Sequence, residues 1–395
     1  MSSSTKNVAK SAAIIVILGL LAKPLGFLRE MLMGSKFGSS METDTYILAL
    51  SAIALFSGLL SKTINTTLIP ILSEVEEKEG KEGKILHTNN FLNLIILASF
   101  ILMLAGMIFT PLIVKLIAPG FDSTKQFNLA ILLIRIGIPA LIFDSTKGVL
   151  IGFLQTEGRF KEGAAVGIPL NLTFIIYLAF LSERFGIIGL MFTATLASIV
   201  QLVYVMYGLK DTPYKHSLHV DIHDEYIKKI LVLIPPILIS VGISDFNSII
   251  DKSIGSTLVE GSISALNYAE KLGQVVRMIF VTAITTVMYP EFAKAANKGD
   301  HDELKESIIT AINLTLLITV PATVGMILLS TPIVKLAFER NKFDAVATAM
   351  TSSALIFTAL RMASSSIRIL LHNVFYSLQD TKVPLYVGGF AVGVN

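Results

Sequence analysis

Cationic side chains are the residues of this sequence whose chemistry stands out, because they lie inside stretches that are otherwise apolar. The cations in these stretches are Lys23, Arg29, Lys62, Arg135, Lys147, Lys271, Arg277, Arg361 and Arg368, and the acids are Glu30, Asp144, Asp245, Asp251 and Glu270. A charge in hydrocarbon is costly unless it faces a cavity or a partner. The excess of cations therefore predicts a water-filled, positively charged chamber within the bilayer, and such a chamber favours an anion.

The composition places the chain among polytopic membrane proteins. Its 395 residues are 53% hydrophobic, with a mean hydropathy of +0.71, and only 15% are charged, against about 25% in a soluble protein. The absence of cysteine excludes disulfides, thiolate metal sites and cysteine nucleophiles. No Walker-type nucleotide loop and no catalytic triad spacing appears in the sequence, so we do not expect an enzyme.

Stretches long enough to cross a bilayer as helices recur along the chain, because a span needs about twenty apolar residues. The candidates are residues 8–33, 45–73, 91–117, 127–154, 164–181, 186–207, 227–252, 264–289, 308–333, 345–376 and 384–395. The sequence thus predicts an all-α polytopic fold. With the N-terminus in the cytoplasm, fifteen lysines and arginines fall in inside loops and six in outside loops, as the positive-inside rule requires.

Strings that recur at a nearly constant offset indicate an internal repeat. TPLIVKL at 110–116 returns as TPIVKL at 331–336, and Glu30 and Gly34 match Asp251 and Gly255, all at offsets between 220 and 224 residues. That offset covers six predicted helices, so both copies enter the membrane in the same direction, as parallel repeats with a substrate site between them do. We expect an N-terminal lobe at 1–225 with helices 1–6 and a C-terminal lobe at 226–395 with helices 7–11. The second copy is expected to be truncated.

The intramembrane charges follow the same repeat. The ranges 8–33, 45–73 and 127–154 carry them, and so do their counterparts 227–252, 264–289 and 345–376. We expect these six helices to line a central cleft. The ranges 91–117, 164–181, 186–207 and 308–333 carry essentially no charge between their ends, so we expect them to face lipid.

The segment from Lys23 to Glu30 is the strongest candidate for a phosphate site. Pro24 removes a backbone donor, so the helix should bend there. Lys23 and Arg29 would then approach a phosphate, with Glu30 orienting one of them. Lys271, which follows Glu270 in the second lobe, would complete the clamp. The alternative for Arg29 is an internal salt bridge, and for Lys271 a snorkel to the membrane surface.

Other charged residues are predicted to line the cleft or to pair with one another. Arg361 and Arg368 share one helix face with His372, and Asp144 and Lys147 lie three residues apart, a spacing typical of a pair. The remaining candidates for the lining are Lys62 and Arg135. For each of them a plain structural role is the alternative. The run from Glu74 to Lys84 is predicted to be a solvated charged loop, and the histidines at 216–224 suggest no metal site.

Two carboxylates are candidates for a coupling site. Asp251 lies near the end of a predicted helix, and its alternative role is a simple pair with Lys252. Together with Asp380 it could instead bind a coupling cation or a proton, which is a common use of carboxylates in membranes.

These residues resemble a known family. The segment from Lys23 to Glu30, followed by Phe37-Gly38 and Asp44, is similar to the opening of the MurJ (MviN) family of lipid II flippases, within the MOP exporter superfamily. Further matching strings are APGF at 118–121, YAEKL at 268–272 and Asp380-Thr381-Lys382 before Pro384. The resemblance runs through the whole chain in order.

The resemblance implies a fold, a substrate and a location. Two lobes would rock about a cationic cavity in the bacterial inner membrane and move undecaprenyl-pyrophosphate-linked peptidoglycan precursor to the outer leaflet. The family's essential cations map onto Lys23, Arg29 and Lys271, with lysine keeping the charge but losing the bidentate fork. Glu30, Asp44 and Glu270 complete the implied substrate site. A sodium site in some members implies Asp251 as a ligand, with Asp380 beside it.

Several other functions stay open at this point. A flippase for another polyprenyl-linked oligosaccharide, of the O-antigen type, would have the same composition. A multidrug/cation antiporter would need an acidic cavity, which the excess of cations disfavours. A membrane scaffold without transport would not need buried lysines. The expected partners are lipid II or a related glycolipid and membrane lipids, with no nucleic acid and no cofactor, and coupling to sodium, protons or membrane potential is open.

Overall fold

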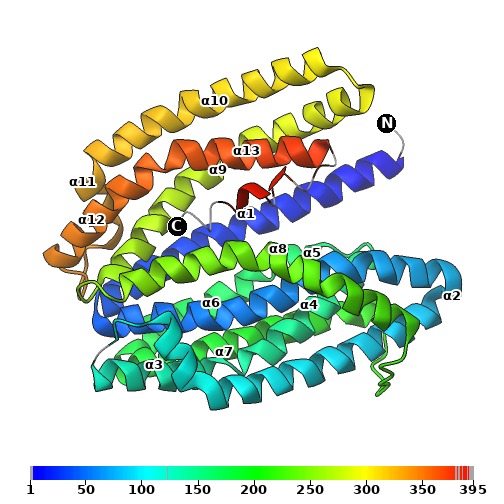
Figure 1. Cartoon of the computed structure of the whole chain (residues 1–395), viewed down its shortest axis with the longest axis horizontal. Helices are drawn as coiled ribbons and strands as arrows, with labels where there is room; N and C mark the ends of the chain where they lie inside the picture. Colours follow the sequence, from blue (N-terminus) through cyan, green and yellow to red (C-terminus); the bar gives the residue numbers. More distant parts are fainter. Residues whose placement is uncertain are drawn as a thin grey trace. The chain divides into compact units, whose positions relative to one another are not determined.

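The computed structural model describes residues 3–121, 123–378, 380, 383, 384, 386–388 and 390. It describes the backbone alone at 3–17, 20, 59–63, 65, 66, 233–247, 279, 280, 282 and 283. Within this part of the chain every regular element is a helix (Figure 1). The prediction of an all-α membrane fold is confirmed.

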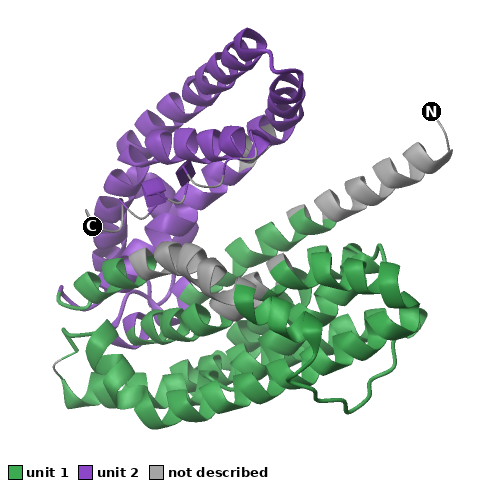
Figure 2. Ribbon diagram, turned by 45° about the vertical axis from the view of Figure 1, so that its right-hand side comes forward, with its two compact units in different colours: residues 1–33, 45–257 green, residues 34–44, 258–395 purple. Residues whose placement is uncertain are grey.

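The chain falls into two compact units (Figure 2). Unit 1 comprises Met1–Met33 and Thr45–Thr257, and unit 2 comprises Gly34–Asp44 and Leu258–Asn395. The turn between the first two helices thus belongs to unit 2, whereas the helices that it joins continue into unit 1. The lobes predicted at 1–225 and 226–395 were defined by the internal sequence repeat and not by contacts. They remain a prediction.

Unit 1 is built from long helices that pack around α7. Its elements are most of α1 (Ser3–Phe37), most of α2 (Met41–Ile117), α3 (Thr124–Gly137), α4 (Ala140–Thr156), α5 (Lys161–Ala165), α6 (Gly167–Phe180), α7 (Ser182–Gly208), the 3-10 helix η1 (Leu209–Asp211) and most of α8 (Glu225–Gly255). Helix α7 contacts α3, α4 and α6.

Unit 2 is built around α9. Its elements are α9 (Ser262–Lys298), α10 (His301–Leu328), α11 (Ser330–Phe338), α12 (Ala345–Leu360) and α13 (Met362–Ser377). Helix α9 contacts α10, α12 and α13, and α9, α10 and α13 lie side by side in Figure 1. Phe292 of α9 and Leu370 of α13 are fully buried in the core that these helices share.

Helix α2 is two helices joined at Gly80. The backbone there has φ 72° and ψ −170°, a region that glycine enters without steric cost. The run from Glu74 to Lys84 is otherwise helical, so the prediction of a loop was wrong, whereas most of its charged side chains are solvated as predicted. The Lys84 amine is buried, lies 2.7 Å from Glu76 and also pairs with Glu157. Lys84 turns inward because Glu76 on α2 and Glu157 just beyond α4 neutralise its charge.

An apolar core holds the two halves of α2 against α4, α7 and α8. Leu68 and Leu72 precede the break and Phe91 follows it, while Phe153 of α4 and Ile230 of α8 fill the space between them. All five side chains are buried. This core fixes the end of unit 1 that also carries the break at Gly80.

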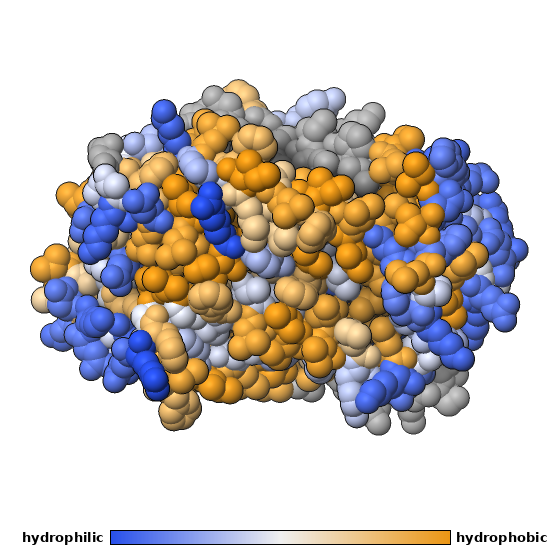
Figure 3. All heavy atoms as spheres, turned by 90° about the horizontal axis from the view of Figure 1, so that it is seen from below, coloured by the Kyte–Doolittle hydropathy of each residue, from blue (hydrophilic) through white to orange (hydrophobic). Residues whose placement is uncertain are grey.

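Five described stretches are long and apolar enough to cross a bilayer, namely Thr67–Ile117, Thr124–Thr156, Lys161–Phe180, Ser182–Asp211 and His301–Leu328. Helices α12 and α13, which meet at 45°, would make a sixth. The first ten predicted spans each fall on a helix or a helix pair, and the eleventh lies mostly outside the described residues. The four ranges expected to face lipid carry many exposed apolar side chains, such as Ile108, Phe180 and Leu328. The face in Figure 3 is correspondingly apolar, with hydrophilic residues toward its two ends.

Candidate functional site

An ion pair on α1 forms the centre of the candidate site in unit 1. A guanidinium nitrogen of Arg29 lies 2.6 Å from a carboxylate oxygen of Glu30. The Glu30 side chain is only 6% exposed, whereas that of Arg29 is 23% exposed. The buried carboxylate therefore neutralises an arginine that is itself partly exposed. The sequence predicted that Glu30 orients one of the two cations of α1, and its partner is the neighbouring Arg29.

Helix α6 supports the Arg29 side chain from behind. The guanidinium carbon lies 5.2 Å from the centre of the Phe174 ring, within the range of a cation–π contact. One turn earlier on α6, the buried Asn171 amide donates to the backbone carbonyl of Ala22 on α1 at 3.1 Å. Phe174 and Asn171 do not stand out in the sequence, because 164–181 carries no charge. A polar Asn171 three residues before an aromatic residue was the only signal.

Lys23 lies on α1 beside Pro24 and is exposed. Within the described part of unit 1 it has no acidic partner, in contrast to Arg29. Lysine on an exposed helix face offers a compact charge with three rotatable donors. Lys23 and Arg29 are therefore two accessible cations on one helix. Only Arg29 is held in a fixed geometry.

Asp44 acts within unit 2, where it caps α9. Its carboxylate oxygens accept hydrogen bonds from the backbone N–H groups of Gly261 and Ser264, each at 2.7 Å. Gly261 is the N-cap residue of α9 and has no side chain to satisfy these donors. The buried Asp44 carboxylate supplies the cap and a favourable charge at the helix N-terminus instead. Ser39 adds a hydrogen bond to Ser264 at 3.0 Å.

The candidates on α9 and at the α12–α13 junction differ in their partners. Glu270 forms an ion pair with Arg361, which lies between the two helices where they bend by 45°. Lys271 is partly buried and forms no ion pair within the described part of unit 2. Arg368 is exposed on α13. Arg361 is the N-cap residue of α13, so the predicted stripe of Arg361, Arg368 and His372 begins at the bend.

The charged residues of α3 and α4 make structural contacts. The Arg135 side chain donates a hydrogen bond to the carbonyl of Met107 at 3.2 Å. In a regular helix this carbonyl would accept from the backbone N–H four residues later, but that residue is Pro111, which has none. The predicted pair of Asp144 and Lys147 is confirmed at 2.6 Å. Lys147 also donates to Gln201 of α7 at 2.5 Å.

The remaining predicted residues are Lys62, Asp251 and Asp380, and each has its own surroundings. The side chain of Lys62 lies outside the described residues. Asp251 is exposed near the end of α8, and the neighbouring Lys252 amine bonds the Ser51 hydroxyl at 2.6 Å. An Asp380 carboxylate oxygen accepts from the backbone of Val383 at 3.3 Å. Among the described residues no group of three acidic or histidine side chains is arranged to hold a metal ion.

Comparisons with known proteins agree on one family. The family model described as lipid II flippase MurJ matches residues 33–395. The probable lipid II flippase MurJ of Rickettsia prowazekii (strain Madrid E) is 31% identical over 393 residues, which are 98% of this chain and 76% of the relative. The lipid II flippase MurJ of Burkholderia cenocepacia is 25% identical over 97% of this chain and 75% of its own length.

Solved structures show the same fold at lower sequence identity. A lipid II flippase MurJ in an inward closed conformation has a TM-score of 0.82 at 23% identity, covering 96% of this chain and 79% of that structure. A multidrug resistance MATE family transporter of the MOP superfamily, in an inward-facing conformation, has a TM-score of 0.74 at 15% identity, covering 97% and 88%. These likenesses concern the fold alone.

Proposed function

Because the chain belongs to the MurJ family of lipid II flippases, we propose that its intramembrane cations hold the pyrophosphate of lipid II while two lobes alternate access across the bacterial inner membrane. The protein is a transporter and not an enzyme. The N-terminus lies in the cytoplasm in this proposal, which follows from the fifteen basic residues in inside loops against six outside. Lipid II then enters from the inner leaflet and leaves into the outer leaflet.

The observation that carries the proposal is the arrangement of Arg29. Its guanidinium is held by the buried Glu30 carboxylate and backed by the Phe174 ring, and the side chain as a whole is 23% exposed. A guanidinium has five N–H donors in a planar fork, so one carboxylate oxygen leaves donors for phosphate oxygens. Fixing the side chain in advance lowers the entropy cost of binding.

Lys23 and Lys271 are proposed to contact the same pyrophosphate as Arg29. Both are accessible to some extent and have no acidic partner within the described part of their own units. An unneutralised amine in a membrane-spanning region is favourable only if water or an anion compensates its charge. Lysines bind phosphate as point charges and so tolerate a ligand that moves between conformations.

Asp44 is proposed to stabilise one state of the transport cycle. It lies in the segment 34–44, whose flanking helices run into unit 1, and it caps α9 in unit 2. Breaking two hydrogen bonds to a charged acceptor is costly, about 1.5–3 kcal/mol each. Such a contact can hold a conformation firmly enough to require substrate binding for its release. Glu270, paired with Arg361, is proposed to keep Lys271 oriented toward the substrate.

Energy for transport is proposed to come from a cation gradient or from the membrane potential. The coupling carboxylates in this proposal are Asp251 and Asp380, with sodium or a proton as the ligand. The membrane potential contributes about 2.3 kcal/mol per elementary charge per 100 mV. Lys62, Arg135, Arg361 and Arg368 remain candidates for lining the cleft.

Complementation tests the proposal. A cell depleted of its own lipid II flippase would receive the full-length gene, its Arg29→Ala variant or its Arg184→Ala variant. Arg184 is a matched control because it is exposed at the start of α7, where it stacks on the neighbouring Phe185. We expect growth with the parent and with Arg184→Ala, and none with Arg29→Ala at equal membrane abundance. Normal growth with Arg29→Ala would contradict the proposal.

A further inference from the structure

The connection between η1 and α8 is an extended segment fixed along α2 by asparagines. The Asn89 amide donates to the carbonyl of Lys215 at 2.8 Å, and the Asn93 amide donates to the carbonyls of Ser217 and His219, each at 3.0 Å. The acceptors are every second residue, which is the period of an extended chain. The segment therefore turns one edge of its backbone toward α2.

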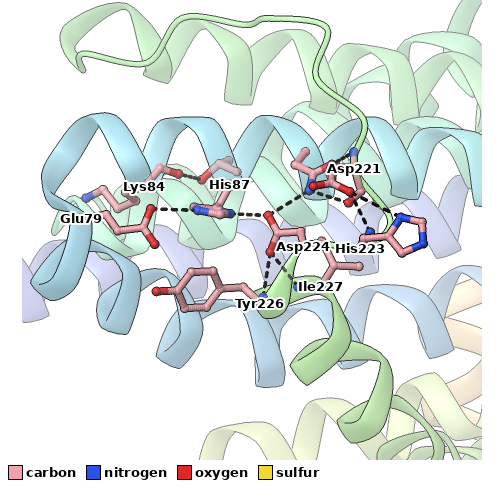
Figure 4. Close-up of polar contacts among 10 residues, drawn as sticks. Glu79, Lys84, His87, Asp221, His223, Asp224, Tyr226 and Ile227 are labelled. Atoms are coloured by element: carbon pink, nitrogen blue, oxygen red, sulfur yellow. Dashed lines mark hydrogen bonds and ion pairs between the residues drawn. The ribbon is translucent and has the colours of Figure 1, made fainter.

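Asn90 and the following residues fasten the C-terminal end of the segment. The Asn90 amide donates to the Asp221 carbonyl at 2.9 Å, and its oxygen accepts from the Asp221 backbone N–H at 2.7 Å. Asp224 then caps α8 and bonds His87 of α2 at 2.5 Å (Figure 4). We name residues 215–222 the strap, and it is tied to α2 at both ends.

The strap presents apolar side chains away from these anchors. Leu218 is 89% exposed, Val220 58% and Ile222 59%. Leu218 and Val220 are spaced by two residues in the extended part of the strap, so the backbone directs them to one common side, and Ile222 follows where the chain turns toward α8. Three exposed apolar side chains on one short segment form a surface that water solvates poorly.

The strap lies on the lipid-facing side of α2. Beyond Asn93 the same helix face continues with exposed apolar residues at helical spacing, namely Leu97, Phe100, Ile101, Leu104 and Ile108. They belong to the stretch Thr67–Ile117, which is long and apolar enough to cross a bilayer. The strap therefore covers the polar end of a lipid-facing stripe on α2. Asn93, which binds the strap, lies one helical turn before Leu97, the first apolar residue of the stripe.

We propose that the strap lies in the membrane interface, with Leu218, Val220 and Ile222 inserted among the headgroups and upper acyl chains of the adjacent leaflet. Apolar side chains next to basic residues bind such an interface, and anionic lipids strengthen the attachment. Lys210 and Lys215 at its start and Lys228 after it are exposed and supply the positive charge. In the proposed orientation this is the cytoplasmic leaflet. The strap then keeps the link between the two predicted lobes at a fixed depth in the membrane.

Single tryptophans test the contact directly, because the chain has no tryptophan of its own. Leu218→Trp, Ile222→Trp and the control Lys81→Trp, which lies on the exposed turn beside Gly80, would be made in the full chain. Each variant would be reconstituted into vesicles of phosphatidylethanolamine and phosphatidylglycerol. Fluorescence would be measured with brominated acyl chains and with aqueous iodide as quenchers.

We expect the two strap variants to emit at shorter wavelength than Lys81→Trp and to lose most of their fluorescence in brominated lipid. Iodide should quench Lys81→Trp much more strongly. The proposal is overturned if both strap variants respond like Lys81→Trp in both assays, and that outcome would assign the apolar face to a protein partner or to none. No lipid II is added, so the result does not depend on the proposed transport activity.

Discussion

The Asp44 carboxylate accepts a hydrogen bond from the backbone N–H of Ser264 at 2.7 Å, although the two residues lie 220 positions apart in the chain. A second bond, from Gly261, completes the cap of α9. A helix that begins with glycine has no side chain of its own at this position, and an acid from the first turn of α2 takes that role. The contact joins a segment near the start of the chain to the centre of unit 2.

Asp44→Asn should weaken this contact, although the asparagine side chain has nearly the same shape as the aspartate side chain. An amide has one oxygen and one NH₂ group, so one of the two backbone donors would meet a donor rather than an acceptor. We expect a loss of about 1–3 kcal/mol of stability and a clear loss of complementation. The thermal unfolding of the purified variant in detergent checks the first expectation. The control is Ser39→Ala, which removes only neutral hydrogen bonds, to Gly261 and Ser264. Equal effects of the two variants would contradict a special role for the carboxylate.

Phe174→Leu should impair substrate binding more than folding. The change keeps an apolar side chain but removes the ring below Arg29, and a cation–π contact contributes about 0.5–2 kcal/mol. We therefore expect weaker lipid II binding at nearly unchanged unfolding temperature, and recovery of binding in Phe174→Trp. Phe180→Leu is the matched control on the same helix, since Phe180 is 80% exposed. Failure of Phe174→Trp to recover binding would argue against the ring as a support.

Asp224 should make the stability of unit 1 depend on pH in the acid range. Burial alone would raise the pKa of Asp224. Backbone N–H groups of α8, the charge of His87 and the Asn90 amide together hold this pKa below its ordinary value. The contribution is therefore fully present above the unfolded-state pKa, about 3.9, and is lost as the pH falls through the lower folded-state value.

Asp224→Asn is the variant that isolates this charge, because asparagine also caps helices well. We expect the variant to unfold at a lower temperature than the parent at pH 7 and to match it more closely as the pH falls below about 4. Asp221→Asn, at an exposed position of the same loop, should show no such trend. A difference between Asp224→Asn and the parent that stays constant with pH would contradict the assignment.

Much of the fold could be predicted from the sequence, because the local composition of a segment is enough to identify a membrane-spanning helix. The helices at 91–117 and 186–207 follow from unbroken apolar runs, and the pair of Asp144 and Lys147 follows from helical spacing. The bend at Arg361 could not be predicted, since neither proline nor glycine marks it. Lys84 was misassigned for a related reason, because its burial depends on Glu157, which is distant in sequence.

The candidate site divides in the same way. Arg29 and Glu30 stand out in sequence because charge is rare in an apolar helix. Phe174 does not, because an aromatic residue in a span is ordinary and only the packing of α6 on α1 brings it to the guanidinium. The cap of α9 by Asp44 likewise requires a contact across most of the chain. Long-range partners of this kind are not encoded in local periodicity.

The central claim is that Arg29 binds the pyrophosphate of lipid II, and equilibrium binding tests it most directly. The full-length protein and its Arg29→Ala and Arg184→Ala variants would be placed in lipid nanodiscs and titrated with lipid II. Losing a charge-assisted bidentate contact of about 1.5–3 kcal/mol should weaken binding at least about tenfold in Arg29→Ala. Arg184→Ala should bind like the parent. Equal affinity of all three proteins would contradict the account.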